Sequence, residues 1–186
     1  MVQLPVWTAI APTVILALTV LLLLVVDSIN PDEDSGNLLA VMAVIGTVTS
    51  IAVTGWYLLA GTGQPPTDPV LLFADAIVVD GMSLFFTALV GSVVVLIVLA
   101  SYDYLADHPY QAEYYSLVML AATGMSLMAS ANSLATAFVS LELASLPSFA
   151  LVASLKHNRG SVEAGLKYFL IGALSSAVFA FGISLV

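Results

Sequence analysis

The sequence predicts an all-α integral membrane protein with six transmembrane helices. Of its 186 residues, 61% are hydrophobic and only 8% are charged, and the mean hydropathy is +1.10. A soluble domain of this length does not have enough interior to bury so much apolar surface. The apolar residues also fall into runs of about 20 residues, the length needed to cross a bilayer.

Composition excludes several kinds of chemistry. The chain has no cysteine, so it forms no disulfide, thiolate nucleophile or cysteine-ligated zinc or iron–sulfur site. His108 and His157 are far apart in the sequence, and we expect no metal site from this chain alone. Three basic residues and a net charge of −9 exclude nucleic-acid binding. The acidic loops are typical of proteins that work in high salt, such as those of a halophilic archaeon.

The first two spans are Trp7–Val26 and Leu38–Leu59, separated by a polar turn. No positively charged segment precedes the first span, so we interpret it as a retained helix and not as a signal peptide. In the second span Gly46, Ser50 and Thr54 recur at every fourth position. This pattern predicts a narrow face for close contact with another helix.

The longest loop is Ala60–Asp80. Within it, Val70–Val79 is apolar but too short to cross a bilayer, and we expect it to lie at the membrane interface. Asp80 directly precedes the third span, Gly81–Ala100, so it is expected to cap the N-terminus of that helix.

The fourth, fifth and sixth spans are Tyr114–Ser130, Asn132–Ser154 and Ser161–Val186. The turn between the fourth and fifth spans is very short, which predicts that these helices are antiparallel neighbours. The fourth span has a predicted contact face of small residues, namely Ala122, Ser126 and Ser130.

Basic residues predict the orientation. Lys156 and Arg159 lie between the fifth and sixth spans, so this turn should be cytoplasmic. Counting back through the spans places the N-terminus outside. The expected location is a prokaryotic cell membrane, crossed several times.

Glu142 is the main candidate functional residue because it lies near the middle of the fifth span. At 1.5 Å per residue the cytoplasmic end is roughly 18 Å away, too far for a glutamate side chain to reach. Ionisable groups at this depth are rare and usually belong to ion pathways. We therefore interpret Glu142 as a proton-binding site or part of a proton relay. The alternative is an acid that only forms hydrogen bonds between helices.

Pro147 follows Glu142 in the same span. It has no amide hydrogen to donate to the carbonyl of Leu143, so it should bend the helix near Glu142. The freed carbonyl could bind water or a cation, or the bend could serve packing alone. Three serines nearby are placed to hold water, namely Ser140, Ser145 and Ser148.

Lys167 lies about 9 Å inside the cytoplasmic end of the sixth span. It could take part in proton transfer, or it could extend to the surface and pair with Glu163 one turn earlier. Glu142 and Lys167 differ in depth by about 9 Å, so we expect a link through water and no direct salt bridge. His157 is a further candidate, as a proton entry group.

Two long segments resemble a known family. YYSLVMLAATGMSLMASANSLATAFVSLELASLPSFALVA and the following SVEAGLKYFLIGALSSAVFAFGISLV are similar to the N subunit of respiratory complex I. That subunit belongs to the proton-conducting antiporter-like superfamily. The segment VDGMSLFF, at the start of the third span, also resembles sequences of that superfamily. The resemblance is strong from Val79 to Val186.

The resemblance implies a subunit of about fourteen helices with two inverted repeats, the first of which starts at the fourth helix. Residues 1–112 would then be the preceding membrane helices, and 113–186 the start of the first repeat. Glu142 matches the family's half-channel glutamate, and Lys167 matches its sixth-helix lysine. The chain covers less than half of the family pattern, so we expect an N-terminal fragment.

The function implied by the resemblance is proton translocation in a complex that transfers electrons from NADH or another donor to quinone. The partners would be other membrane subunits, and the quinone, flavin and iron–sulfur clusters would belong to partner subunits. One alternative is a subunit of a cation/proton antiporter or of a membrane-bound hydrogenase. Another is a structural membrane fragment that transports nothing.

Overall fold

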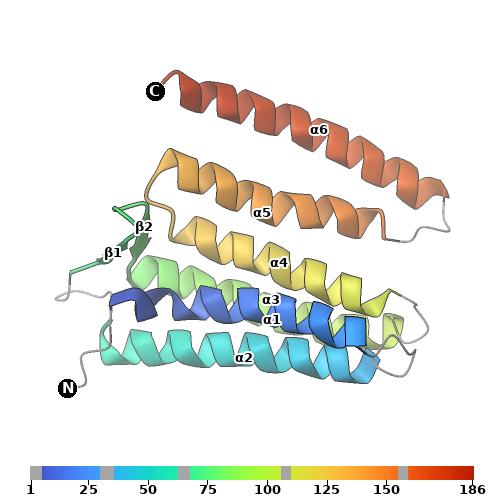
Figure 1. Ribbon diagram of the computed structural model, residues 1–186, viewed down its shortest axis with the longest axis horizontal. Coiled ribbons are helices and arrows are strands. Elements are labelled where there is room, and N and C mark those ends of the chain that lie inside the picture. The colour runs from blue at the N-terminus through green and yellow to red at the C-terminus, as the bar shows by residue number, and fades with distance from the viewer. Residues whose placement is uncertain (1–5, 30–35, 63–67, 106–109, 155–158) are drawn as a thin grey trace.

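A computed structural model describes residues 6–29, 36–62, 68–105, 110–154 and 159–186. In these ranges six α-helices form one bundle, with a β-hairpin at one end (Figure 1). The helices are η1 (Val6–Ile10, a 3₁₀ turn), α1 (Ala11–Ile29), α2 (Gly36–Ala60), α3 (Gly81–Tyr104), α4 (Gln111–Ala129), α5 (Leu134–Val152) and α6 (Arg159–Ser184). Each predicted span is therefore confirmed as a helix.

Five of the described helices are long and apolar enough to cross a membrane, and α4 is the one that is not. Its sequence carries several tyrosine, serine and threonine residues. α4 lies at the centre of the bundle, where it packs against α1, α3 and α5 (Figure 1). Because most of its surface faces other helices, α4 does not need an apolar surface toward lipid.

The core of the bundle lies between α1, α2, α3 and α4. Its fully buried side chains include Leu16, Leu23, Leu39, Val98 and Met119. α5 packs against α4 on one side and α6 on the other, so α6 is the outermost helix (Figure 1).

The small-residue face predicted on α2 is confirmed as a contact with α1. Gly46 lies directly against the side chain of Thr19. The hydroxyl of Ser50 donates a hydrogen bond of 2.8 Å to the carbonyl of Pro12, and Thr54 is fully buried. A larger residue at Gly46 would push the two helices apart.

The apolar loop segment at 70–79 is a β-hairpin, which sequence reasoning missed. Strands β1 (Val70–Leu72) and β2 (Ile77–Val79) pair in antiparallel register. The turn between them contains no glycine, yet Phe73, Ala74 and Asp75 have φ values of 52°, 54° and 64°. Such values are uncommon for residues with a side chain, so no turn signal was present in the sequence.

The hairpin holds the connection between α4 and α5. The amide of Val78 donates to the carbonyl of Ser130 at 2.8 Å, and the amide of Asn132 donates to the carbonyl of Ala76 at 3.0 Å. The side chain of Asn132 also donates to the carbonyl of Asp75. These bonds fix the point at which the chain enters α5.

Asp80 caps α3 as predicted. Its carboxylate accepts a hydrogen bond of 2.7 Å from the amide of Ser83. The hydroxyl of Ser83 accepts one of 2.8 Å from the amide of Asp80. This reciprocal pair satisfies two amides at the helix start.

Candidate proton-transfer site

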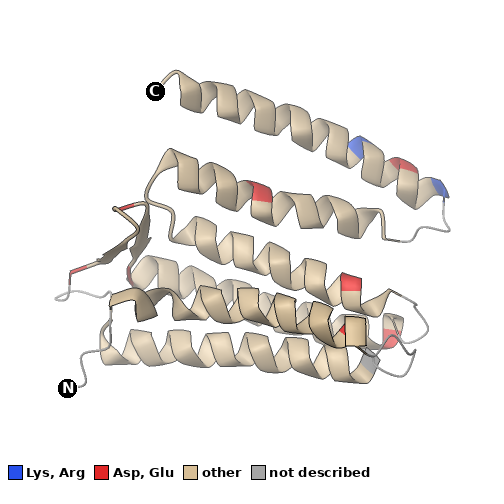
Figure 2. Ribbon diagram, in the orientation of Figure 1, with Lys and Arg blue, Asp and Glu red and all other residues tan. Residues whose placement is uncertain are grey.

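Glu142 lies midway along α5, as predicted (Figure 2). The helix begins at Leu134 and is capped by Ser133, whose hydroxyl accepts a hydrogen bond from the amide of Thr136. It then continues to Val152. The remaining sequence of α5 is uncharged, so Glu142 is a single acid at mid-depth.

One carboxyl oxygen of Glu142, Oε1, is buried and has no hydrogen-bond partner among the described residues. The side chain as a whole is half-buried in this chain. A buried polar atom without a partner is unfavourable. Oε1 is therefore placed to accept a hydrogen bond from a group outside the described residues.

The three serines predicted to hold water each donate to a backbone carbonyl of α5, and their binding of water stays a prediction. Ser140 donates to Thr136 at 2.7 Å, and Ser148 donates to Ala144 at 2.8 Å. The longer bond of Ser145, at 3.4 Å, is made to the carbonyl of Glu142 itself. Each hydroxyl oxygen keeps the ability to accept a hydrogen bond.

Pro147 is buried within α5, and the helix continues through it to Val152. Since proline has no amide hydrogen, the carbonyl of Leu143 loses its usual helical donor. This carbonyl belongs to the residue next to Glu142. The bend predicted at Pro147 stays a prediction.

Lys167 forms an ion pair with Glu163, one turn earlier on α6. The two side chains are 69% and 66% exposed in this chain. The structure thus shows the surface pair that was one of the two alternatives, and it does not pair Lys167 directly with Glu142. The predictions for Lys156 and His157, and for the loop residue His108, concern positions outside the described residues.

α6 is attached to α5 by an aromatic seam that sequence reasoning missed. The ring of Phe149 on α5 lies 4.7 Å from that of Tyr168 and 6.1 Å from that of Phe169, measured between centroids. The same ring packs against Gly172. Gly165 lies against Ala153 further along the seam. The seven-residue spacing of the two glycines, which places them on one helix face, was the available signal.

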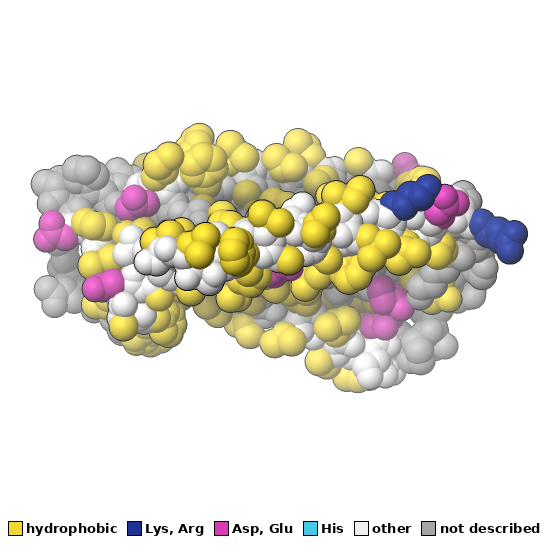
Figure 3. Space-filling view, turned by 90° about the horizontal axis from the view of Figure 1, so that it is seen from above, with side chains coloured by type: hydrophobic (Ala, Val, Ile, Leu, Met, Phe, Trp, Pro, Cys, Tyr) yellow, Lys and Arg dark blue, Asp and Glu magenta, His cyan; other side chains and the backbone are white. Residues whose placement is uncertain are grey.

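Among the described helices, α6 packs mainly against α5, and many side chains on its other faces are exposed. Figure 3 shows hydrophobic side chains along this helix and basic side chains at one of its ends. Leu170, Leu174 and Val178 are among the exposed side chains. A surface of this kind fits lipid or further membrane helices.

A cluster of three hydroxyls joins α1, α3 and α4. The hydroxyl of Ser126 lies 2.7 Å from that of Thr13 and 3.0 Å from that of Thr87. All three side chains are buried. The cluster links helices that lie far apart in the sequence, and only the fold of the bundle brings them together.

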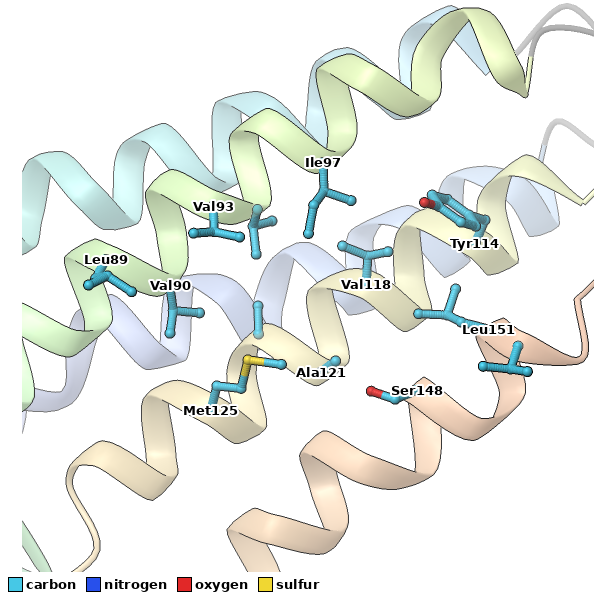
Figure 4. Close-up of a pocket in the computed structure, with 13 residues that line it drawn as sticks. Leu89, Val90, Val93, Ile97, Tyr114, Val118, Ala121, Met125, Ser148 and Leu151 are labelled. Atoms are coloured by element: carbon cyan, nitrogen blue, oxygen red, sulfur yellow. The ribbon is translucent and has the colours of Figure 1, made fainter. Parts of the chain in front are cut away.

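A cavity of about 570 Å³ lies between α3, α4 and α5 (Figure 4). Its walls are apolar apart from the hydroxyls of Tyr114 and Ser148. Glu142 is not one of its lining residues, so this cavity is separate from the candidate proton site. Within the described part of the chain, His, Asp and Glu side chains form no group of three that could hold a metal ion.

Comparison with known proteins confirms the resemblance. Residues 131–186 match the NADH:quinone oxidoreductase/Mrp antiporter transmembrane family. The chain is 34% identical over 180 residues to the F(420)H(2) dehydrogenase subunit N of Methanosarcina mazei, covering 95% of this chain and 36% of that protein. It is 36% identical over 176 residues to the NADH-quinone oxidoreductase subunit N of Rhodospirillum rubrum, covering 94% and 35%.

Solved structures agree with these relatives. A chain in respiratory complex I from Thermus thermophilus superposes with a TM-score of 0.71 at 30% identity, over 92% of this chain and 35% of that one. A chain of an archaeal membrane-bound sulfane sulfur reductase superposes with a TM-score of 0.80 at 20% identity, covering 96% and 36%, and shows the shared fold. The present chain thus spans about a third of the length of the relatives that it matches. The family match starts at residue 131, and the domain boundary between 112 and 113 stays a prediction.

Proposed function

We propose that this chain belongs to the NADH:quinone oxidoreductase/Mrp antiporter transmembrane family, which residues 131–186 match, and that it translocates protons in a respiratory membrane complex. The complex would pass electrons from NADH or another donor to quinone. The observation that carries the proposal is Glu142, a mid-span acid within the matched segment whose Oε1 is buried without a partner among the described residues.

The proposed cycle uses a change of charge near Glu142. When a cationic side chain moves toward this carboxyl, Coulomb attraction favours the ionised form and the proton leaves. When the cation withdraws, this attraction is lost and a proton binds again. Redox work in partner subunits would drive this alternation, and a proton would enter from one side of the membrane and leave to the other.

Lys167 is the second proposed proton-transfer residue, in spite of its ion pair with Glu163. Its partner is exposed in this chain, and exposed pairs of this kind contribute only about 0.3–0.5 kcal/mol. So weak a pair can open when another carboxylate comes near. In this proposal the Lys167 side chain has two positions. In one it pairs with Glu163, and in the other it is linked to Glu142 through water.

The proposed partners are other membrane subunits of the complex and the surrounding lipid. The exposed apolar surfaces of α5 and α6 support this assignment. Since the chain has no cysteine, we assign iron–sulfur clusters, and with them flavin and quinone, to partner subunits. We propose a prokaryotic cell membrane as the location, with the N-terminus outside and the turn between α5 and α6 in the cytoplasm.

The test is donor-dependent proton pumping in native membrane vesicles that carry Glu142→Gln. Glutamine keeps the size of the side chain but cannot release a proton. We expect electron transfer and pumping to fall together while the complex stays assembled. Glu113→Gln is the matched control, because Glu113 is an exposed acid at the start of α4. If Glu142→Gln pumps as well as the wild type, Glu142 is structural and the proposal is wrong.

A second candidate is a subunit of a cation/proton antiporter, favoured by the Mrp antiporter membership of the same family. A copurified complex distinguishes the two. A sodium gradient that drives proton movement without any electron donor would support the antiporter.

A further inference from the structure

The backbones of α4 and α5 come unusually close at Gly124. A Cβ atom added there would lie 2.6 Å from the carbonyl carbon of Leu143 and 2.9 Å from the Cα of Ala144. The backbone nitrogen of Ala144 would be closer still. These are main-chain atoms that cannot rotate aside as a flexible side chain would. Any residue larger than glycine at position 124 therefore has to move one of the two helices.

This crossing point lies directly beside Glu142. Leu143 is the next residue along α5. Its carbonyl is also the one that Pro147 leaves without a helical donor. The close approach of Gly124 thus coincides with the carbonyl at which α5 lacks one helical hydrogen bond.

On its other side, α4 is held in place by Ser126. Two residues along a helix correspond to a rotation of about 200°, so Ser126 points away from α5. Its hydroxyl lies within hydrogen-bond distance of Thr13 on α1 and Thr87 on α3, and its side chain is fully buried. α4 therefore has no room to retreat toward α1 and α3 when a group is added at Gly124.

We propose that Gly124 is a positioning residue for Glu142. Ser126 holds α4 in place on the side that faces α1 and α3. An added methyl group would displace α5 by about 1 Å, the difference between the distances above and an ordinary carbon–carbon contact. The displacement falls on the segment that carries Glu142. The inference rests on the proposed role of Glu142 in proton transfer. Since a shift of 1 Å at a reacting group reduces rates by up to about 100-fold, we expect a loss of about tenfold or more.

The experiment measures pumped protons per electron, and their dependence on pH, in native vesicles that contain the whole complex. Gly124→Ala is compared with Gly55→Ala on α2, where an added Cβ has no described atom within 4 Å. We expect Gly124→Ala to assemble, to lose about tenfold or more of its pumping and to shift its pH profile. Gly55→Ala should behave as the wild type does. A role in packing alone would lower the yield of complex without moving the pH profile.

Glu142→Gln is measured beside these variants so that the two hypotheses can fail separately. If Glu142→Gln stops pumping but assembled Gly124→Ala keeps the wild-type pH profile, the positioning role is wrong and the proposed function stands. If Glu142→Gln pumps normally, the proposed function itself fails.

Ser126→Ala covers the case in which Gly124→Ala does not assemble. This variant adds no volume, and it loosens α4 from the side opposite Gly124. A shifted pH profile in assembled Ser126→Ala supports the positioning of Glu142 by α4, whereas an unchanged profile overturns it.

Discussion

Replacing Phe149 by alanine should weaken the packing of α6 against α5 while the rest of the bundle stays folded. Phe149 is only 8% exposed, and its ring makes edge contacts with Tyr168 and Phe169. It also fills the space above Gly172. No other described helix packs against α6 to a comparable extent, so α6 depends on its contacts with α5, which also include the rings of Phe138 and Phe179 at 5.9 Å.

The magnitude follows from the two ring pairs. Each aromatic pair contributes about 0.5–1.5 kcal/mol beyond area burial, so their loss weakens the seam by about 1–3 kcal/mol. That range corresponds to a roughly 5- to 150-fold shift toward detached α6. In lipid no hydrophobic force between helices compensates, because association there depends on packing.

The assay is the distance between spin labels attached to cysteines introduced at two exposed positions, Val139 on α5 and Leu174 on α6, measured in the purified complex by pulsed electron paramagnetic resonance. A population with a longer distance should grow in Phe149→Ala by the factor above. Phe149→Leu is the comparison: it also loses both ring pairs but keeps apolar bulk, so the difference between the two variants measures the buried area. Identical distances in wild type and Phe149→Ala would refute the aromatic seam.

Two further predictions concern charged residues. Asp80→Ala removes the side-chain acceptor for the amide of Ser83 and should lower the stability of the complex by about 1 kcal/mol in thermal denaturation; an unchanged melting curve would show that the cap is not needed. Lys167→Met removes an exposed ion pair with Glu163, so stability should change by less than about 0.5 kcal/mol. The same variant should nevertheless lose proton pumping. Normal pumping would assign Lys167 to the surface pair alone.

The helices and their order could be predicted from the sequence because a bilayer imposes a simple rule. Every backbone group in hydrocarbon must be bonded within its own segment, so long apolar runs become helices. The bilayer also made Glu142 stand out as a candidate, since a charged side chain in the middle of a span is energetically unfavourable. Asp80 was predictable too, because a helix cap depends only on neighbouring residues.

The hairpin was not predictable by the same means. Its turn uses Phe73, Ala74 and Asp75 at positive φ without a glycine, and its stabilising partner, the segment around Ser130 and Asn132, lies far along the chain. α4 shows the reverse case. Its sequence is too polar to satisfy a rule based on hydropathy, and only the fold shows that it lies at the centre of the bundle, where its polar side chains face other helices.

The sequence by itself determined the membrane class, the number and order of the helices, and the depth of Glu142, because each depends on local hydropathy and spacing. Only the tertiary structure decided that α4 is central, that Lys167 pairs with Glu163, and that Gly124 meets the backbone of α5 beside Glu142. Contacts between helices depend on which faces are turned toward one another. That choice is made by packing across the whole bundle, and no short stretch of sequence contains it.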